Sequence, residues 1–196
     1  MLLNGMIKLC KIPQRLKKGL IVSIPKPNKD SLIKGNNRGL TLLPTIYKVL
    51  EKIIMMREND WIQETICPIQ SCGKEHVSCV HTSFVVQQAV AVNLNEGRAV
   101  HGGQLDTRKA FDALWILGMM YKLYKENLNP KAWLLAYDSY QNFMCTAYVN
   151  GIAGPWFTPR RGVHQGAPLS MVWYTVLVND LLKDLCNYPN GLCVYR

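Results

Sequence analysis

The chain has 196 residues, of which 48% are hydrophobic and 18% charged, a composition typical of a folded domain with a substantial core. No apolar run reaches the roughly 20 residues that span a bilayer, and the N-terminus lacks the apolar segment and cleavage site of a signal peptide. We interpret the seven cysteines, an odd number, as intracellular thiols. These features exclude a transmembrane, secreted, collagen-like or disulfide-stapled protein.

The net charge of +10 lies entirely in the first third of the chain. Residues 1–57 contain twelve of the 23 lysines and arginines but only two acidic residues, whereas the charges of the remaining residues cancel. A positive field of this kind suits a polyanion such as a nucleic acid or a nucleotide phosphate. A solvated basic face is the alternative that charge alone leaves open.

The first half of the chain shows strand, loop and helix patterns in turn. Residues 19–25 are β-branched and end at a proline, which predicts a short strand, and 26–37 form a loop rich in Lys, Asn, Gly and Asp. Apolar residues with helical spacing predict a helix over 45–64. Residues 65–81 are irregular, and a second helix is expected at about 83–94.

The second half begins with a short extended stretch that ends at 105–106 and leads into a helix over about 109–126. The expected core contacts of this helix are Leu114, Leu117, Tyr121 and Leu123. A further helix follows Pro130, because proline suits the first helical turn. Residues 143–149 alternate in character and meet an Asn-Gly pair, which predicts a hairpin, and a last helix starts near 168–170 and ends near 185. This mixture of helices and short strands indicates an α+β fold.

Two polar strings carry the candidate chemistry. Residues 104–112 read QLDTRKAFD and place Asp106 at the end of the extended stretch, where a carboxylate can bind a hard cation such as Mg²⁺. Most such aspartates are instead helix caps or turn formers. Residues 160–170 read RRGVHQGAPLS, a glycine-flanked turn that lets the backbone and Gln165 approach a base or sugar. The alternative for this string is a proline-containing helix start with Ser170 near the cap.

Both strings resemble characteristic segments of reverse transcriptases, namely motif A (LDTRKAFD) and motif B (RRGVHQGAPLS). The Leu-Trp pair after the first string and Asn-Asp-Leu-Leu after the second resemble the LINE-type, non-LTR retrotransposon branch. Upstream, IVSIPKPNKD and NNRGLTLLPTIYKVLEKIIMMR are similar to the fingers segment of that family, and QSCGKEHVSCVHTSFVVQQAV to the loop and helix before motif A. The segments occur in the expected order over nearly the whole chain.

The resemblance implies a right-hand polymerase fold, with residues 1–100 as part of the fingers and 101–196 as a partial palm carrying motifs A and B. It implies an RNA-directed DNA polymerase whose partners are an RNA template, a DNA primer and dNTPs. It also implies two Mg²⁺ ions as cofactors, because two metals stabilise the attacking oxygen and the departing pyrophosphate. Asp106 matches the first catalytic aspartate and metal ligand, and the Thr107 backbone carbonyl a further ligand.

Other positions match the family's nucleotide-binding residues. Two fingers residues are expected to hold the triphosphate, for which charge-assisted bonds to phosphate are the natural chemistry. A bulky residue after motif A's aspartate is expected to crowd a ribose 2′-OH, and the motif B turn to lie beside nucleotide and template. The matching residues are Lys26, Arg38, Phe111, Gln165 and Gly166. Lys29 lies in the same loop as Lys26 and is the alternative to it.

The family's motif C, Tyr/Phe-x-Asp-Asp, does not occur in the 196 residues, so two of its metal-binding carboxylates are missing. Asp180 and Asp184 are no substitute, because they belong to the helix after motif B. We therefore expect a polymerase fragment that is inactive alone. The alternative is a non-catalytic nucleic-acid-binding remnant of such an element.

A cysteine–histidine cluster lies between the two expected helices of the first half: Cys67, Cys72, His76, Cys79 and His81. The first cysteine pair has a spacing found in zinc sites, but the remaining three residues are crowded for a second pair. Incidental thiols in a family loop are the alternative interpretation.

Overall fold

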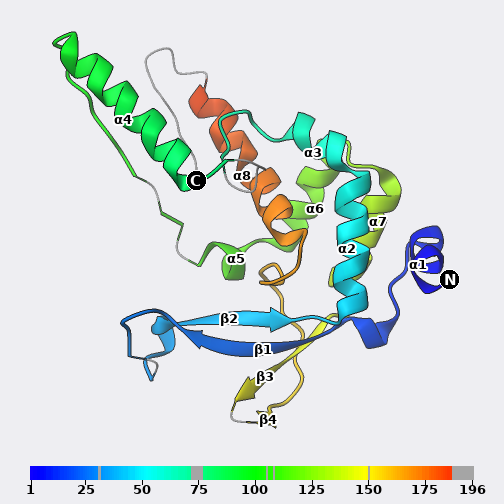
Figure 1. The fold of residues 1–196 in the computed structure, drawn as a ribbon. Helices are drawn as coiled ribbons and strands as arrows, with labels where there is room; N and C mark the ends of the chain where they lie inside the picture. Colours follow the sequence, from blue (N-terminus) through cyan, green and yellow to red (C-terminus); the bar gives the residue numbers. More distant parts are fainter. Residues whose placement is uncertain (31, 72–76, 105, 108, 150, 187–196) are drawn as a thin grey trace.

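A computed structural model gives the architecture of the chain. It describes residues 1–30, 32–71, 77–104, 106–107, 109–149 and 151–186. The chain folds as a mixed α+β domain in which helices gather over a small sheet (Figure 1), as the sequence predicts. No helix of the described residues is long and apolar enough to cross a membrane.

The sheet has the order β2-β1-β3-β4 and joins two distant parts of the sequence. Its strands are β1 (Lys18–Pro25), β2 (Asn37–Leu42), β3 (Met144–Val149) and β4 (Ile152–Ala153). β1 and β2 form an antiparallel hairpin, and β3 pairs parallel to β1 with Lys18 opposite Met144. β4 returns antiparallel to β3 after Gly151, whose φ of 84° the turn requires. The predicted strand at 19–25 is confirmed, as are the strand at 143–149 and the hairpin that follows it.

Most of the described helices form one cluster. The cluster consists of α1 (Leu2–Leu9), α2 (Thr45–Arg57), α3 (Asn59–Thr65), α6 (Ile116–Lys125), α7 (Pro130–Tyr140) and α8 (Ser170–Cys186). Two short 3₁₀ helices, Gln14–Leu16 and Lys34–Asn36, flank β1 and β2. α5 (Ala110–Ala113) lies between α8 and the hairpin, and α4 (Cys79–Asn95) extends away from the sheet (Figure 1). None of the residues of α4 is buried.

One hydrophobic core connects the helices to the sheet. Its most enclosed side chains, at 2% exposure or less, include Tyr47 of α2, Leu123 of α6, Phe143 before β3, and Trp173 and Val176 of α8. Since a helix buries residues three or four apart, each helix supplies one such stripe. The core thereby fixes α2 and α8 relative to β1–β3, and so positions the hairpin, α5 and the segment before α8, which form the candidate site.

Two predicted helices are each divided in the structure. The helix expected over 45–64 breaks at Glu58 (φ −97°, ψ 15°), between α2 and α3. The helix expected over 109–126 breaks between α5 and α6, where Leu114 has an extended backbone (ψ 132°). The break changes the face that is buried, so the prediction that Leu117 and Tyr121 are core contacts is wrong, and both are more than 60% exposed. Leu114 and Leu123 are buried as predicted.

Three further local features differ from the sequence prediction. α1 and β2 were not predicted, because each is stabilised by distant partners: α1 by burial of Met6 in the core, and β2 by pairing with β1. The extended stretch expected to end at 105–106 is not a strand over its described residues, since residues 98–104 have no regular structure and join no sheet. Residue 105 lies outside the described residues.

Candidate nucleotide site

A cavity of about 470 Å³ lies where the β1–β2 hairpin faces α5 and the segment before α8. This volume lies within the range of small-molecule sites. Its lining comes from three separate parts of the sequence: Lys26, Gly35, Asn37 and Arg38; Thr107, Lys109, Ala110, Phe111 and Asp112; and Gln165. We call it the hairpin cavity.

The far end of the hairpin supplies two cations. Arg38 begins β2 opposite Ile24, and Lys26 directly follows β1. The loop between them closes on itself, with the Lys26 N–H donating to the Asn36 carbonyl at 2.8 Å and the Lys26 Nζ to the Gly35 carbonyl at 2.9 Å. These bonds hold the Lys26 ammonium beside the loop backbone.

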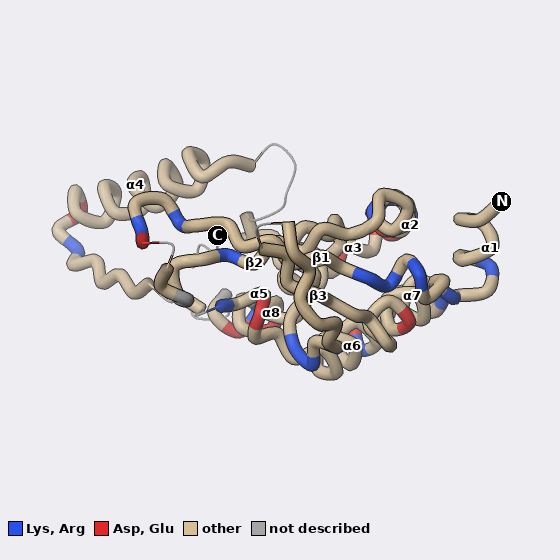
Figure 2. Tube along the Cα trace, turned by 90° about the horizontal axis from the view of Figure 1, so that it is seen from below, with Lys and Arg blue, Asp and Glu red and all other residues tan. Residues whose placement is uncertain are grey.

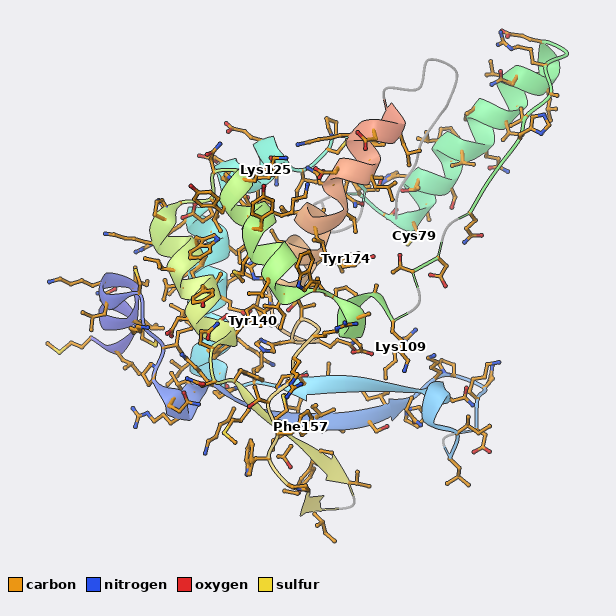
Figure 3. All side chains as sticks on the ribbon, turned by 180° about the vertical axis from the view of Figure 1, so that it is seen from behind. Cys79, Lys109, Lys125, Tyr140, Phe157 and Tyr174 are labelled. Carbon is orange, nitrogen blue, oxygen red and sulfur yellow. The ribbon has the colours of Figure 1, made fainter. Side chains whose placement is uncertain are left out.

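α5 supplies a cation, an aromatic ring and a carboxylate. Lys109 precedes the helix in a left-handed conformation (φ 53°, ψ 43°) and lies on the side of α5 that faces the hairpin (Figure 3). The Phe111 ring packs against the ring of Tyr174 on α8 with centroids 5.2 Å apart, which fixes its orientation. Asp112, in the first turn of α5, accepts a hydrogen bond of 2.9 Å from the Gln165 side chain.

Residues 162–169, called the entry turn because they lead into α8, hold Gln165 at the cavity. The Thr41 N–H donates to the Gln165 carbonyl at 2.8 Å, and the Val163 N–H donates to the Phe111 carbonyl at 2.9 Å. Gly166 has a φ of 108°, and a Cβ there would lie 3.1 Å from the Thr41 carbonyl oxygen. The turn is thus tied to β2 on one side and to α5 on the other.

Five of the site residues predicted from the sequence line this one cavity: Lys26, Arg38, Thr107, Phe111 and Gln165. Gly166 adjoins it through the entry turn, and Lys26 rather than Lys29 is the loop lysine in its lining. Asp106 is exposed and is not part of the lining.

Sequence reasoning assigned no role to Lys109, and for Asp112, six residues after Asp106, it predicts only a charge that complements the start of the following helix. Asp112 does lie in the first turn of α5, but its carboxylate also bonds Gln165 at the cavity. Lys109 depends on a left-handed backbone that a lysine rarely adopts, so no sequence pattern indicates it.

Among the described residues, the cavity lining carries three cations, Lys26, Arg38 and Lys109, against the single carboxylate of Asp112. Such a lining attracts a ligand with several negative charges, and a guanidinium can bind phosphate oxygens through two hydrogen bonds. The half-buried Phe111 adds an apolar surface for a sugar or base. The arrangement is suited to a phosphate-bearing ligand with a flat or apolar part.

The described residues do not by themselves fit the predicted pair of Mg²⁺ ions. In the part of the chain that the structure describes, no group of three or more His, Cys, Asp or Glu residues could hold a metal ion. Two ions held in register require several carboxylates, whereas here Asp112 is engaged by Gln165 and Asp106 lies outside the cavity lining. The described residues therefore supply no complete ligand set for two Mg²⁺ ions.

The described members of the cysteine–histidine cluster form no group that could hold a metal ion. The Cys67 backbone N–H donates to Asn179 of α8, and the His81 ring accepts the Ser78 N–H as part of a capping box at the start of α4. Cys72 and His76 lie outside the described residues. A helix-capping role accounts for His81.

Basic residues also follow one another from α1 to the start of β1 (Figure 2). Lys8, Arg15 and Lys18 are exposed, and the Lys18 ammonium lies 5.1 Å from the centre of the Trp156 ring. Lys17, in contrast, is 5% exposed and forms an ion pair with Asp138. The positive charge of this segment is therefore mostly, but not entirely, available to a partner.

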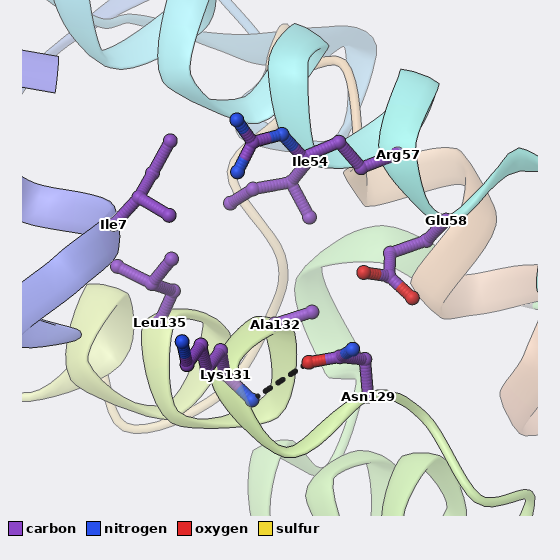
Figure 4. Close-up of a pocket in the computed structure, with 8 residues that line it drawn as sticks. All are labelled: Ile7, Ile54, Arg57, Glu58, Asn129, Lys131, Ala132 and Leu135. Atoms are coloured by element: carbon purple, nitrogen blue, oxygen red, sulfur yellow. Dashed lines mark hydrogen bonds between the residues drawn. The ribbon is translucent and has the colours of Figure 1, made fainter. Parts of the chain in front are cut away.

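A second cavity of about 250 Å³ lies between α1, the end of α2 and the start of α7 (Figure 4). Ile7, Ile54 and Leu135 form its apolar part, while Arg57 and Glu58 lie at its α2 side. None of the predicted site residues lines it.

Together, the fold and the hairpin cavity define an α+β domain with a cation-rich site at the junction of a hairpin, a short helix and a turn. A family model described as reverse transcriptase (RNA-dependent DNA polymerase) matches residues 24–196, and the chain belongs to this family. The resemblance predicted from motifs A and B is thereby confirmed.

The curated relatives are proteins of mobile elements. The chain is 25% identical to the probable RNA-directed DNA polymerase from transposon X-element of Drosophila melanogaster, over 98% of this chain and 22% of the relative. It is 26% identical to the transposon TX1 149 kDa protein of Xenopus laevis, over 97% and 14%, and 26% identical to the RNA-directed DNA polymerase from mobile element jockey of Drosophila melanogaster, over 92% and 20%. The chain thus spans about a fifth or less of the length of these relatives, consistent with a fragment.

Proposed function

We propose that the chain is the nucleotide-binding part of a non-LTR retrotransposon reverse transcriptase, with residues 1–100 belonging to the fingers and 101–196 to the palm. The incoming dNTP occupies the hairpin cavity. The observation that supports this is the convergence of Lys26, Arg38, Phe111 and Gln165, from three segments distant in sequence, on one cavity of about 470 Å³. RNA template and DNA primer are the nucleic-acid partners.

Each lining residue then has a physical role. Lys26, Arg38 and Lys109 neutralise the triphosphate through charge-assisted hydrogen bonds. Phe111, braced by Tyr174, stands where a 2′-hydroxyl would need space and so favours deoxynucleotides. Gln165, held by Asp112, faces the base or sugar. Reverse transcriptases generally use divalent metal ions, and Asp106 with the Thr107 carbonyl are the ligands that this chain would contribute.

The test compares the affinities of the chain for dATP and ATP, which differ only in the 2′-hydroxyl, by isothermal titration calorimetry. Loss of a hydrogen bond to a charged group costs about 1.5–3 kcal/mol, so Arg38→Ala should weaken dATP binding roughly tenfold or more. Arg57→Ala, at the second cavity, is the matched control and should leave the affinity unchanged. Phe111→Ala should remove the preference for dATP. Equal affinities of the Arg38 and Arg57 variants would contradict the proposal.

The non-catalytic nucleic-acid-binding remnant is the second candidate, and the concentration of positive charge in residues 1–57 supports it. RNA-templated primer extension separates the two. We expect none from this polypeptide, because it contains no Tyr/Phe-x-Asp-Asp string. Binding of RNA without any binding of dATP would favour the remnant, whereas extension abolished by Asp106→Ala would show a complete enzyme.

A further inference from the structure

A buried carboxylate lies behind the entry turn. Glu51 of α2 is 8% exposed, and its Oε2 accepts the Leu169 N–H at 3.3 Å, where the entry turn meets α8. Within the part of the chain that the structure describes, no lysine or arginine pairs with it. A buried carboxylate without a cation is costly, so its hydrogen bonds must compensate.

The second partner of Glu51 extends the contact into the turn. The Tyr47 hydroxyl hydrogen-bonds the Glu51 carboxylate and lies 3.4 Å from Nδ1 of His164. The His164 ring is stacked on Tyr140 of α7 (centroids 4.7 Å; Tyr140 is labelled in Figure 3) and packs against Phe143 at 3.9 Å. Glu51, Tyr47 and His164 thus form one buried chain of hydrogen bonds from α2 to the turn.

These hydrogen bonds end next to Gln165, the residue of the entry turn that lines the hairpin cavity. His164 directly precedes Gln165, whose side chain bonds Asp112 at the cavity. The His164 carbonyl also accepts the Ser170 hydroxyl at 2.8 Å, which closes the turn onto α8. A shift of His164 or of the Leu169 N–H therefore displaces Gln165.

We propose that Glu51 is a positioning residue for the nucleotide site: through Tyr47 and the Leu169 N–H it sets the conformation of the entry turn that presents Gln165. The consequence for nucleotide binding rests on the function proposed above. The hydrogen-bond chain itself is independent of any ligand.

The hydrogen bonds between Glu51, Tyr47 and His164 can form in either protonation state of Glu51, with donors and acceptors exchanged. When Glu51 is ionised, Nδ1–H of His164 donates to the Tyr47 oxygen, and the Tyr47 O–H donates to Glu51. When Glu51 is protonated, it donates to Tyr47, which donates to an unprotonated Nδ1 of His164. A proton taken up at Nε2 of His164 balances the change, as the Nδ1 proton moves to Tyr47 and the Tyr47 proton to Glu51. Ser139 also faces the Tyr47 hydroxyl, but its own proton is donated to the Ala136 carbonyl, so it supplies no proton to these hydrogen bonds.

Glu51 titrates in a range of pH that is accessible to experiment. Burial raises the pKa of Glu51 to about 7, and burial lowers the pKa of His164 to about 4, so His164 is neutral while Glu51 titrates. The titratable groups that face Glu51 are the phenols of Tyr47 and Tyr140 and the His164 ring, and burial raises the pKa of both phenols well above 10. Near pH 7 the change therefore appears as a switch between two neutral tautomers of His164.

The first measurement is the ring ¹⁵N NMR spectrum of histidine-labelled chain between pH 5.5 and 8.5, with His164 assigned from the His164→Asn variant. In the wild type we expect His164 to pass from the Nε2–H tautomer to the Nδ1–H tautomer with a midpoint near 7. Glu51→Gln should abolish the transition, and the control Glu58→Gln should retain it. A single tautomer throughout in the wild type, or the same transition in Glu51→Gln, would overturn the proposal.

The second measurement is the dATP affinity at pH 8. Glu51→Ala leaves the Leu169 N–H and Tyr47 without their acceptor and should weaken binding at least fivefold. Glu51→Gln keeps an acceptor for the N–H and should stay within twofold of the wild type, a rescue that a purely charge-based role would not allow. If both variants bind as the wild type does, Glu51 does not position the site. If the wild type binds no dATP, the proposed function fails while the His164 spectrum still decides the hydrogen-bond chain.

Discussion

The ion pairs of Asp138 give the most quantitative test of how the segment before β1 is held. Asp138 of α7 is 5% exposed and accepts hydrogen bonds from the Lys17 ammonium at 2.7 Å, the Ile12 N–H at 2.8 Å and the Lys11 ammonium at 3.0 Å. The two lysines differ in burial, since the Lys17 side chain is 6% exposed and that of Lys11 is 76% exposed. One carboxylate therefore offers a buried pair and an exposed pair for comparison.

Asp138→Ala leaves the Lys17 ammonium buried without a counter-charge, a change that costs about 3–5 kcal/mol. This is a large part of the roughly 5–15 kcal/mol by which a domain is stable. Lys11→Met removes only an exposed partner and should cost about 1 kcal/mol or less. Urea denaturation followed by circular dichroism measures both free energies of unfolding. An Asp138→Ala variant within about 1 kcal/mol of the wild type, or an equal loss in Lys11→Met, would refute this reasoning.

The same carboxylate gives a pH dependence. Burial alone would raise the pKa of Asp138, but the hydrogen bonds from Lys17, Ile12 and Lys11 outweigh it and hold the pKa below the ordinary 3.8. The ionised group therefore stabilises the fold above that value, and the contribution is lost as the pH falls through the lower folded pKa. The stability difference between wild type and Asp138→Ala should shrink below about pH 4.

Two further predictions concern the turn and the basic segment. Gly162→Ala should cost about 1–3 kcal/mol in urea denaturation, because φ is 92° and a Cβ would lie 2.9 Å from a carbonyl oxygen of α5; Gly102→Ala, with nothing within 4 Å, should cost far less and so serves as the control. RNA affinity should fall steeply with salt, and Lys8→Gln with Lys18→Gln should weaken it and reduce the logarithmic salt slope by about 1 for each phosphate that is no longer neutralised. Lys183→Gln, on α8, should leave the RNA affinity and slope unchanged, and an unchanged slope in the Lys8 and Lys18 variants would contradict the second prediction.

Local sequence signals predicted those elements that depend on near neighbours. β1 ends at Pro25, α7 begins at Pro130, and β3 turns at Gly151, all as expected. β2 could not be predicted in this way, because its pairing with β1 supplies its stability. The break at Glu58 likewise has no proline or glycine to indicate it. The two helices have different partners: Glu51 of α2 accepts the Leu169 N–H, whereas the Trp61 ring of α3 donates to the Glu126 carbonyl.

For the candidate site, the resemblance to the family predicted more of the lining residues than composition and local sequence patterns did. Composition located the positive charge in residues 1–57, which contain Lys26 and Arg38. The family motifs selected Lys26, Arg38, Phe111 and Gln165, which the fold brings to one cavity. Their roles remain predictions. Lys17, one of the counted cations, proved to be buried in an ion pair, since charge counting cannot distinguish an exposed lysine from a paired one.

Labelling of lysines by an acyl-phosphate derivative of dATP tests the central claim, that the hairpin cavity binds the triphosphate. The reagent transfers its acyl group to lysines near the bound phosphates, and mass spectrometry locates the modified residues. We expect labelling of Lys26 and Lys109, which line the cavity, and its suppression by excess dATP, while the exposed Lys29 and Lys131 react weakly and without suppression. Labelling that follows exposure alone, with Lys131 modified as much as Lys109 and no effect of dATP, would contradict the account.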